Sequence, residues 1–208
     1  MKATLRRIAV ALFVLILCYE PSMVYADQTI TFGTTCGNED SFGRTATNRE
    51  LFAQPFTPSI NGSKVTATVY MATLGSPTDS ATVDVYSDSA GVPNVSISSG
   101  AATISHSSLP ADTGCSSITS TVMSPITVTL VSGTQYWLVF GRTGTLDDTN
   151  RYALAECTTC DGSLKQYAFT SSNTWTQRAA GYEARGSLVV TAAVAVTPTT
   201  GYSTILWW

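Results

Sequence analysis

Hydrophobic and polar residues alternate along several short segments of this chain. The apolar positions of Lys64–Thr73 fall on every second residue, at Val65, Ala67, Val69 and Met71. Because successive side chains of a β-strand point to opposite faces, this spacing predicts a strand with one buried face and one solvated face.

Six further segments are rich in β-branched and aromatic residues and are separated by Gly, Pro, Asn, Asp and Ser. They are Ala81–Tyr86, Ile126–Leu130, Tyr136–Arg142, Tyr152–Glu156, Gln166–Thr170 and Gly186–Val196. This succession of strands and turns is typical of an all-β sandwich or barrel. No stretch after residue 26 shows a helical period with caps, so we expect short helices at most. The pattern predicts a single antiparallel β-sandwich of jelly-roll type.

The expected sandwich occupies residues 51–196. Residues 27–50 are richer in Gly, Asn and charge, and this composition predicts an irregular segment before the first core strand. The turn Val131–Thr134 lies between two predicted strands and predicts a hairpin. Residues 197–208 are read as a linker or a truncated tail. Their ending, Ile205–Trp208, fits an anchor stub, a truncated reading frame or a last strand equally well.

The first 26 residues have the pattern of a secretory signal peptide. Lys2, Arg6 and Arg7 precede an apolar run, Ile8–Cys18, and a small residue, Ala26, stands at the expected cleavage position. The apolar run is shorter than the about 20 residues that a membrane-spanning helix needs. We expect a secreted or cell-surface protein without a membrane span in the mature chain, unless a C-terminal anchor is missing. An uncleaved N-terminal anchor is the alternative.

Removal of the signal peptide leaves an acidic chain. Without Lys2, Arg6, Arg7 and Glu20, the 11 basic and 14 acidic residues become 8 and 13, a formal charge of −5. Proteins that bind nucleic acid neutralise phosphates with Lys and Arg, so this balance argues against a nucleic-acid partner.

Four cysteines follow the signal peptide, and export favours their oxidation. We expect Cys157 and Cys160 to close the short CxxC loop, which leaves Cys36 to pair with Cys115. Pairing of Cys36 with Cys157 or Cys160 is the main alternative, because four cysteines allow three connectivities. A zinc site or a redox pair is a further alternative reading of the CxxC motif.

Three stretches between Leu51 and Gly186 carry a resemblance to a known family. They are Ala53–Pro58, Val83–Pro93 and Val128–Val139. Together they resemble the choice-of-anchor R domain, a family of bacterial exported domains that carry different C-terminal anchoring signals on a similar β-sandwich. The resemblance implies a surface module of undetermined ligand and no reaction. The four cysteines are not part of the recognised pattern, and no complete sorting signal follows Val196.

Catalytic chemistry has few candidates in this chain. His106 is the one histidine, and no Gly-x-Ser-x-Gly elbow accompanies it, so we expect no catalytic triad. A glycosidase needs two carboxylates at a suitable separation, and Glu156 and Glu183 are the candidates. The alternative is that both glutamates are ordinary carboxylates, either solvated or paired with an arginine. Asp147, Asp148 and Asn150 form an oxygen-rich loop that suits either calcium or an ordinary turn, and we expect no bound cofactor.

Exposed aromatic residues are the remaining functional candidates. Trp175 lies in a polar, turn-like segment and, with Tyr167 and Tyr182, forms a candidate ligand platform. The alternative is a Trp that covers the end of the core. We therefore expect a secreted or cell-surface, non-catalytic module that binds a surface polysaccharide or cell-wall ligand. The alternatives are a purely structural or adhesive protein and a secreted glycosidase-like hydrolase.

Overall fold

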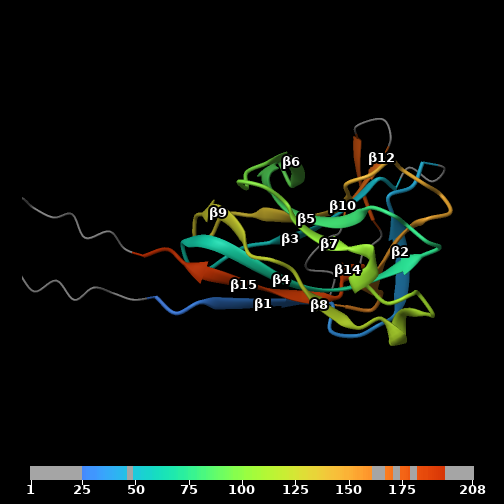
Figure 1. Ribbon diagram of the computed structural model, residues 1–208. Helices are drawn as coiled ribbons and strands as arrows, with labels where there is room; N and C mark the ends of the chain where they lie inside the picture. The colour runs from blue at the N-terminus through green and yellow to red at the C-terminus, as the bar shows by residue number, and fades with distance from the viewer. Residues whose placement is uncertain (1–24, 46–48, 161–166, 171–173, 179–181, 195–208) are drawn as a thin grey trace, which may run out of the picture. The chain divides into compact units, whose positions relative to one another are not determined.

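Two antiparallel sheets pack face to face in the computed structural model (Figure 1). The structure describes residues 25–45, 49–160, 167–170, 174–178 and 182–194, and it describes residues 167–170 by their backbone alone. The eight-stranded sheet has the strand order β1 (Gln28–Phe32), β15 (Gly186–Ala192), β4 (Gly62–Leu74), β11 (Arg151–Cys157) and β14 (Glu183–Ala184). Three further strands pair beside this order: β2 (Asn38–Phe42) with β11, and both β8 (Ser120–Val122) and β9 (Ile126–Leu130) with β4.

The seven-stranded sheet has the order β13 (Thr174–Gln177), β12 (Tyr167–Thr170), β3 (Leu51–Phe56), β10 (Tyr136–Arg142), β5 (Ser80–Ser89) and β6 (Val92–Ser96), with β7 (Ala102–Ser105) on β5. The helical elements of the described residues are two 3₁₀ turns, η1 (His106–Ser108) and η2 (Cys115–Ser117). These sheets confirm the predicted all-β sandwich, while the jelly-roll arrangement of its connections stays a prediction.

The core fills the space between the two inner faces. Val65, Ala67, Val69 and Met71 of β4 are fully buried, so the period-two pattern of this strand is confirmed. Val83 and Val85 of β5 face them from the other sheet within the same cluster. Fully burying a Val, Leu or Phe side chain contributes about 1.5 to 3 kcal/mol, so this inner layer is the main stabilising element of the fold.

The predicted hairpin at Val131–Thr134 is wrong. The strand before the turn, β9, pairs with β4, whereas the strand after it, β10, pairs with β3 and β5 in the other sheet. The turn therefore carries the chain from one layer to the other (Figure 1). A tight turn between two strands fits a hairpin or a crossing equally well, and the turn residues alone do not distinguish the two.

The composition of residues 27–50 predicted an irregular segment, and this prediction is wrong. These residues contain β1, which pairs with β15, and β2, which pairs with β11. Strand β2 was missed because its sequence, Asn-Glu-Asp-Ser-Phe, is polar, yet Asp40 is 8% exposed. Ion pairs from Arg49 and Arg178 compensate the buried carboxylate of Asp40, so a strand with an apparently solvated sequence packs inside the protein.

Residues 26–193 form one compact unit, which contains residues 51–193 of the expected sandwich together with the N-terminal strands. The chain ends form a second unit, of which only Tyr25 and Val194 are described. Most of the predicted signal peptide and all of the tail at 197–208 lie outside the described residues. No helix among the described residues is long and apolar enough to cross a membrane.

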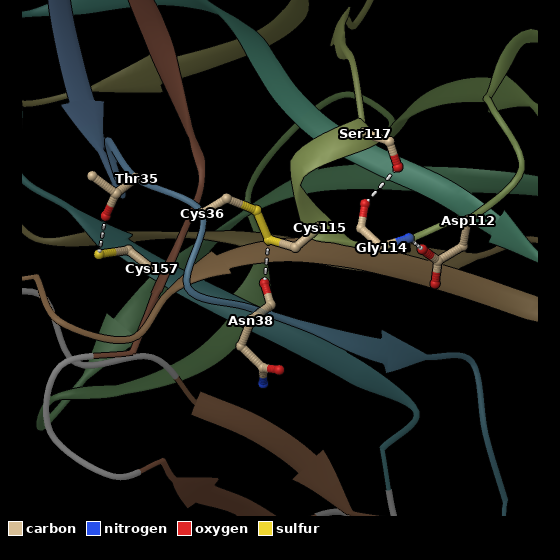
Figure 2. Close-up of a disulfide and its surroundings, with 8 residues drawn as sticks. All are labelled: Thr35, Cys36, Asn38, Asp112, Gly114, Cys115, Ser117 and Cys157. Atoms are coloured by element: carbon tan, nitrogen blue, oxygen red, sulfur yellow. Dashed lines mark hydrogen bonds between the residues drawn. A yellow bond between two sulfur atoms is a disulfide. The ribbon is translucent and has the colours of Figure 1, made fainter.

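Two disulfides confirm the expected pairing. Cys36 joins Cys115 across 79 residues of sequence, and Cys157 joins Cys160. Figure 2 shows the first bond tying the start of β2 to the η2 segment, with Cys115 Sγ against the carbonyl of Asn38. Both cysteines of this bond pack on a small cluster on the outer side of β4 and β11, made of Ala72, Ile118, Ala153 and Ala155.

Candidate functional site

The two carboxylates of the hydrolase hypothesis do not meet. In the pairing of β11 with β14, Glu156 lies opposite Ala184 and Cys157 lies opposite Glu183. Paired residues of an antiparallel ladder point to the same face, so the two glutamates point to opposite faces of the sheet. Glu156 is fully buried and Glu183 is 5% exposed. No described arrangement therefore brings them together as a pair around one substrate bond.

Glu156 instead belongs to an ion cluster between the sheets. Arg178 donates to Glu156 and, from Nη2, to Asp40 Oδ2 at 2.6 Å. Its guanidinium lies over the rings of Phe52 and Tyr182, with 5.0 Å and 4.6 Å to the ring centroids. The Arg178 side chain is 11% exposed, so both carboxylates meet their cation away from bulk water.

A buried amide bonds the two sheets beside this cluster. Gln54 of β3 is fully buried, and its Oε1 accepts the backbone N–H of Ala184 in β14 at 2.7 Å. Together with Arg178, this bond fixes the ends of strands from both layers. We interpret the cluster as a structural tie, because its acids already accept charge-assisted hydrogen bonds from an arginine that aromatic rings hold in place.

The loop considered for calcium uses its oxygens internally. Asp147 Oδ1 accepts the backbone N–H groups of Thr149 and Asn150, and its Oδ2 accepts Asn150 Nδ2 at 2.9 Å. Asp148 Oδ2 accepts the hydroxyl of Thr45 at 2.6 Å. These bonds, led by the one from the Asn150 side chain, lower the pKa of Asp147 to about 2. This is the geometry of an Asx turn. Within the described residues, no group of three or more His, Cys, Asp or Glu side chains is placed to hold a metal.

His106 lies next to a second structural carboxylate, Asp79. Its Nδ1 lies 3.1 Å from the carbonyl oxygen of Asp79. The Asp79 carboxylate accepts two hydrogen bonds of 2.7 Å from Arg142, and a third from Gly144 N–H. Burial alone would raise the pKa of Asp79, but the bonds from Arg142 and Gly144 outweigh it and lower that pKa. The histidine thus contacts a backbone oxygen at the edge of an Arg–Asp pair.

Trp175 lies on the outer face of the seven-stranded sheet. The turn-like interpretation of its segment is wrong, because Trp175 is part of β13 and pairs with Phe169 of β12. It packs against a cluster made of Ala53, Trp137 and Val139 and remains partly exposed. Trp175 therefore fits each hypothesis in part, because it packs on apolar residues outside the central core and is also partly exposed.

Two neighbouring strands hold this face in place. Trp137 of β10 is 1% exposed, and its indole N–H donates to Asp88 Oδ1 at 2.8 Å. Asp88 Oδ2 accepts Gly91 N–H in the β5–β6 turn, where Ala90 and Gly91 both have positive φ. Consecutive positive φ values define the type I′ turn that suits a two-residue hairpin. The turn therefore positions the carboxylate that fixes Trp137.

Tyr86 is the member of this face that the sequence interpretation missed. It pairs with Trp137 across β5 and β10, packs on the same cluster and stays partly exposed. Burial, followed by the charge of Asp84, raises the pKa of its hydroxyl. The alternation of β5 contained the signal, because Tyr86 lies on the polar side of that strand, opposite the buried Val83 and Val85.

The three predicted aromatic residues do not form one platform. Tyr182 stacks on Arg178 in the ion cluster, so it is separate from the face of Trp175. Tyr167 pairs through its backbone with Ala53 and Gln177, and its side chain lies outside the described part of the structure. We define the outer aromatic face as Leu51, Ala53, Tyr86, Trp137, Val139 and Trp175.

Comparison with family models and with curated proteins found no match to this chain.

Proposed function

We propose that the protein is a secreted or cell-surface, non-catalytic module that binds a surface polysaccharide on the outer aromatic face. The observation that carries this proposal is the position of Trp175, which is held on a packed apolar cluster while part of its side chain stays in solvent. Aromatic side chains supply large, rigid contact area, and their flat faces suit the apolar faces of sugar rings.

The surroundings of the face support a polar, ring-shaped ligand. Asp84 lies on the same side of β5 as Tyr86, and it accepts the hydroxyl of Ser98. Gln177, two residues after Trp175, is exposed. Such side chains offer hydrogen bonds to sugar hydroxyls beside the rings. The resemblance of three stretches to the choice-of-anchor R domain supports the same class of role, a module displayed outside the cell.

Retention on insoluble polysaccharides tests the proposal. The purified mature protein is mixed with cellulose, chitin, xylan or peptidoglycan, and the bound fraction is measured for the wild type and for Trp175→Ala. We expect the wild type to be retained by one of these matrices and the variant to be released. Val122→Ala is the matched control, because Val122 is 66% exposed on β8 of the other sheet. Its retention should equal that of the wild type.

Circular dichroism of the same samples separates a lost contact from a lost fold. A Trp that supports the main core would cost about 3 to 5 kcal/mol on truncation to Ala, whereas a surface Trp leaves a folded protein. If the wild type binds no matrix, the proposal fails and a structural or adhesive role takes its place. If reducing sugar is released, and Glu156→Gln or Glu183→Gln abolishes that release, the protein is a hydrolase.

A further inference from the structure

A hollow of about 240 Å³ lies on the outer face of the eight-stranded sheet, on the opposite layer from the outer aromatic face. Its lining includes Thr31, Thr68, Tyr70, Arg185 and Ser187. The guanidinium of Arg185 lies on the ring of Tyr70, with 3.9 Å between its central carbon and the ring centroid. None of these residues belongs to the proposed polysaccharide face.

The fold builds this hollow from three adjacent strands. Thr31 of β1 pairs with Ser187 of β15, and Ser187 pairs with Thr68 of β4, so three hydroxyl side chains form a row across the sheet. Figure 1 shows these strands side by side. Tyr70 follows Thr68 by two residues on β4 and so shares its face, and Arg185, in the bend just before β15, lines the same hollow.

Strand β4 changes its pairing partner beside this hollow. Strand β4 pairs with β15 up to Val69 and with β11 from Met71 onward. Gly186 lets the strands stay close there, because a Cβ at this position would lie 2.4 Å from the carbonyl oxygen of Thr68. A side chain at Gly186 would therefore push the strands apart and deform the hollow.

Among the described residues, none accepts a hydrogen bond from the Arg185 guanidinium. Arg185 is the one arginine among the described residues whose guanidinium makes neither an ion pair nor a hydrogen bond. No acidic residue lines the hollow. Glu183, two residues before Arg185, is 5% exposed, and its Oε2 accepts the N–H of Gly33 at 3.1 Å. Arg185 is thus a partly exposed arginine that meets no carboxylate in the described part of this acidic chain.

Tyr70 fixes the orientation of that arginine. The tyrosine packs against the outer cluster of Ala72, Ile118, Ala153 and Ala155, close to the disulfide of Cys36 and Cys115. Stacking on an aromatic face holds a guanidinium in one plane and leaves its N–H edges available. Because Arg185 already covers this ring, the hollow offers an anion-binding fork rather than an open ring for a neutral sugar.

We propose that this hollow is a second ligand site, which binds a sugar residue carrying a carboxylate, that is, a uronic acid. Its carboxylate accepts paired hydrogen bonds from Arg185, the geometry in which arginine binds carboxylates most strongly. The ring hydroxyls bond with Thr31, Thr68 and Ser187. The site is independent of Trp175, because it lies on the other sheet.

Isothermal titration calorimetry with glucuronate, glucose and glucose 6-phosphate tests this site on the wild-type mature protein. We expect saturable binding of glucuronate and none of glucose. Equal binding of glucose would overturn the proposal, because the carboxylate would then contribute nothing. Equal or tighter binding of glucose 6-phosphate would overturn the choice of carboxylate and would indicate a general anion site. Absence of glucuronate binding at low salt would also overturn it.

Variants then locate the site. Arg185→Gln should weaken glucuronate binding about tenfold or more, since a hydrogen bond to a charged group is lost. Arg185→Lys keeps the charge but loses the paired geometry, and it should also weaken binding. Ser187→Ala, a small change on the same row, keeps the test valid if an Arg185 variant fails to fold. Trp175→Ala should bind glucuronate like the wild type, so failure of this site and failure of the polysaccharide face are distinguishable.

Discussion

Replacement of Arg178 by Met tests whether the ion cluster stabilises the sandwich. Removing one partner of a buried ion pair costs about 3 to 5 kcal/mol, because the remaining charges stay buried. Arg178 bonds both the side chain of Asp40, which is 6% exposed, and the side chain of Glu156, which is 0% exposed. Asp40 also pairs with Arg49, whose side chain is 37% exposed, so one cation stays close. We therefore expect the low end of the range, about 3 kcal/mol.

Urea unfolding followed by tryptophan fluorescence measures this loss. For a domain of this size, a slope of about 2 to 3 kcal/mol per molar urea converts 3 kcal/mol into a midpoint lowered by about 1 to 1.5 M. Arg44→Met is the matched control. Arg44 Nε lies 3.6 Å from Asp148 Oδ1 in a more exposed ion pair. Loss of a surface ion pair lowers the free energy of unfolding by about 1 kcal/mol or less.

A double variant isolates the ionic part of the effect. Glu156→Gln in the Arg178→Met background leaves no glutamate charge at the buried position, so the double variant should lose less stability than Arg178→Met alone. The reasoning is refuted if Arg178→Met costs no more than Arg44→Met, or if the losses from Arg178→Met and Glu156→Gln simply add.

Two further properties of the molecule are open to direct measurement. Replacing Cys36 and Cys115 by Ala should lower the free energy of unfolding by about 4 to 5 kcal/mol, the value of the chain-entropy model for a separation of 79 residues. A thiol count of the oxidised mature protein should find no free cysteine. Because the pKa of Asp147 is about 2 in the folded protein, below its value of 3.8 as a free side chain, its stabilising contribution is complete above about pH 4 and is lost as the pH falls towards 2. Asp147→Asn should therefore reduce stability at pH 6 more than at pH 2, and chelators should shift the melting temperature little, since N–H donors already occupy the Asp147 oxygens. A large drop on chelation that calcium restores would contradict that view of the loop.

The strands with a clear period of two were predictable from the sequence. In β4 and β5 the burial alternates as the apolar residues do, because one face of each strand meets the other sheet. Strand β2 was not predictable in this way. Its buried Asp40 is stabilised by Arg178, which lies far along the chain, and no local pattern shows such a partner.

The candidate site shows the same limit. Tyr136 and Trp137 are adjacent on β10 and point to opposite faces, as strand alternation requires, with Tyr136 in the central core and Trp137 in the outer aromatic face. Whether β9 and β10 share a sheet depends on pairing partners that are distant in sequence. The residues that surround Trp175 are likewise brought together by strand pairing between distant segments. The hollow beside Arg185 escaped prediction because its lining comes from β1, β4 and β15, which are distant in sequence and meet only through strand pairing.

Chemical-shift mapping with a soluble oligosaccharide from the retaining matrix tests the central claim most directly, namely that the outer aromatic face binds glycan. We expect saturable shifts at the Trp175 indole N–H and at the backbone amides of Tyr86 and Val139, with residues on the outer side of β4 unchanged. Saturable shifts confined to other surfaces, with Trp175 and Tyr86 unmoved, would contradict the claim.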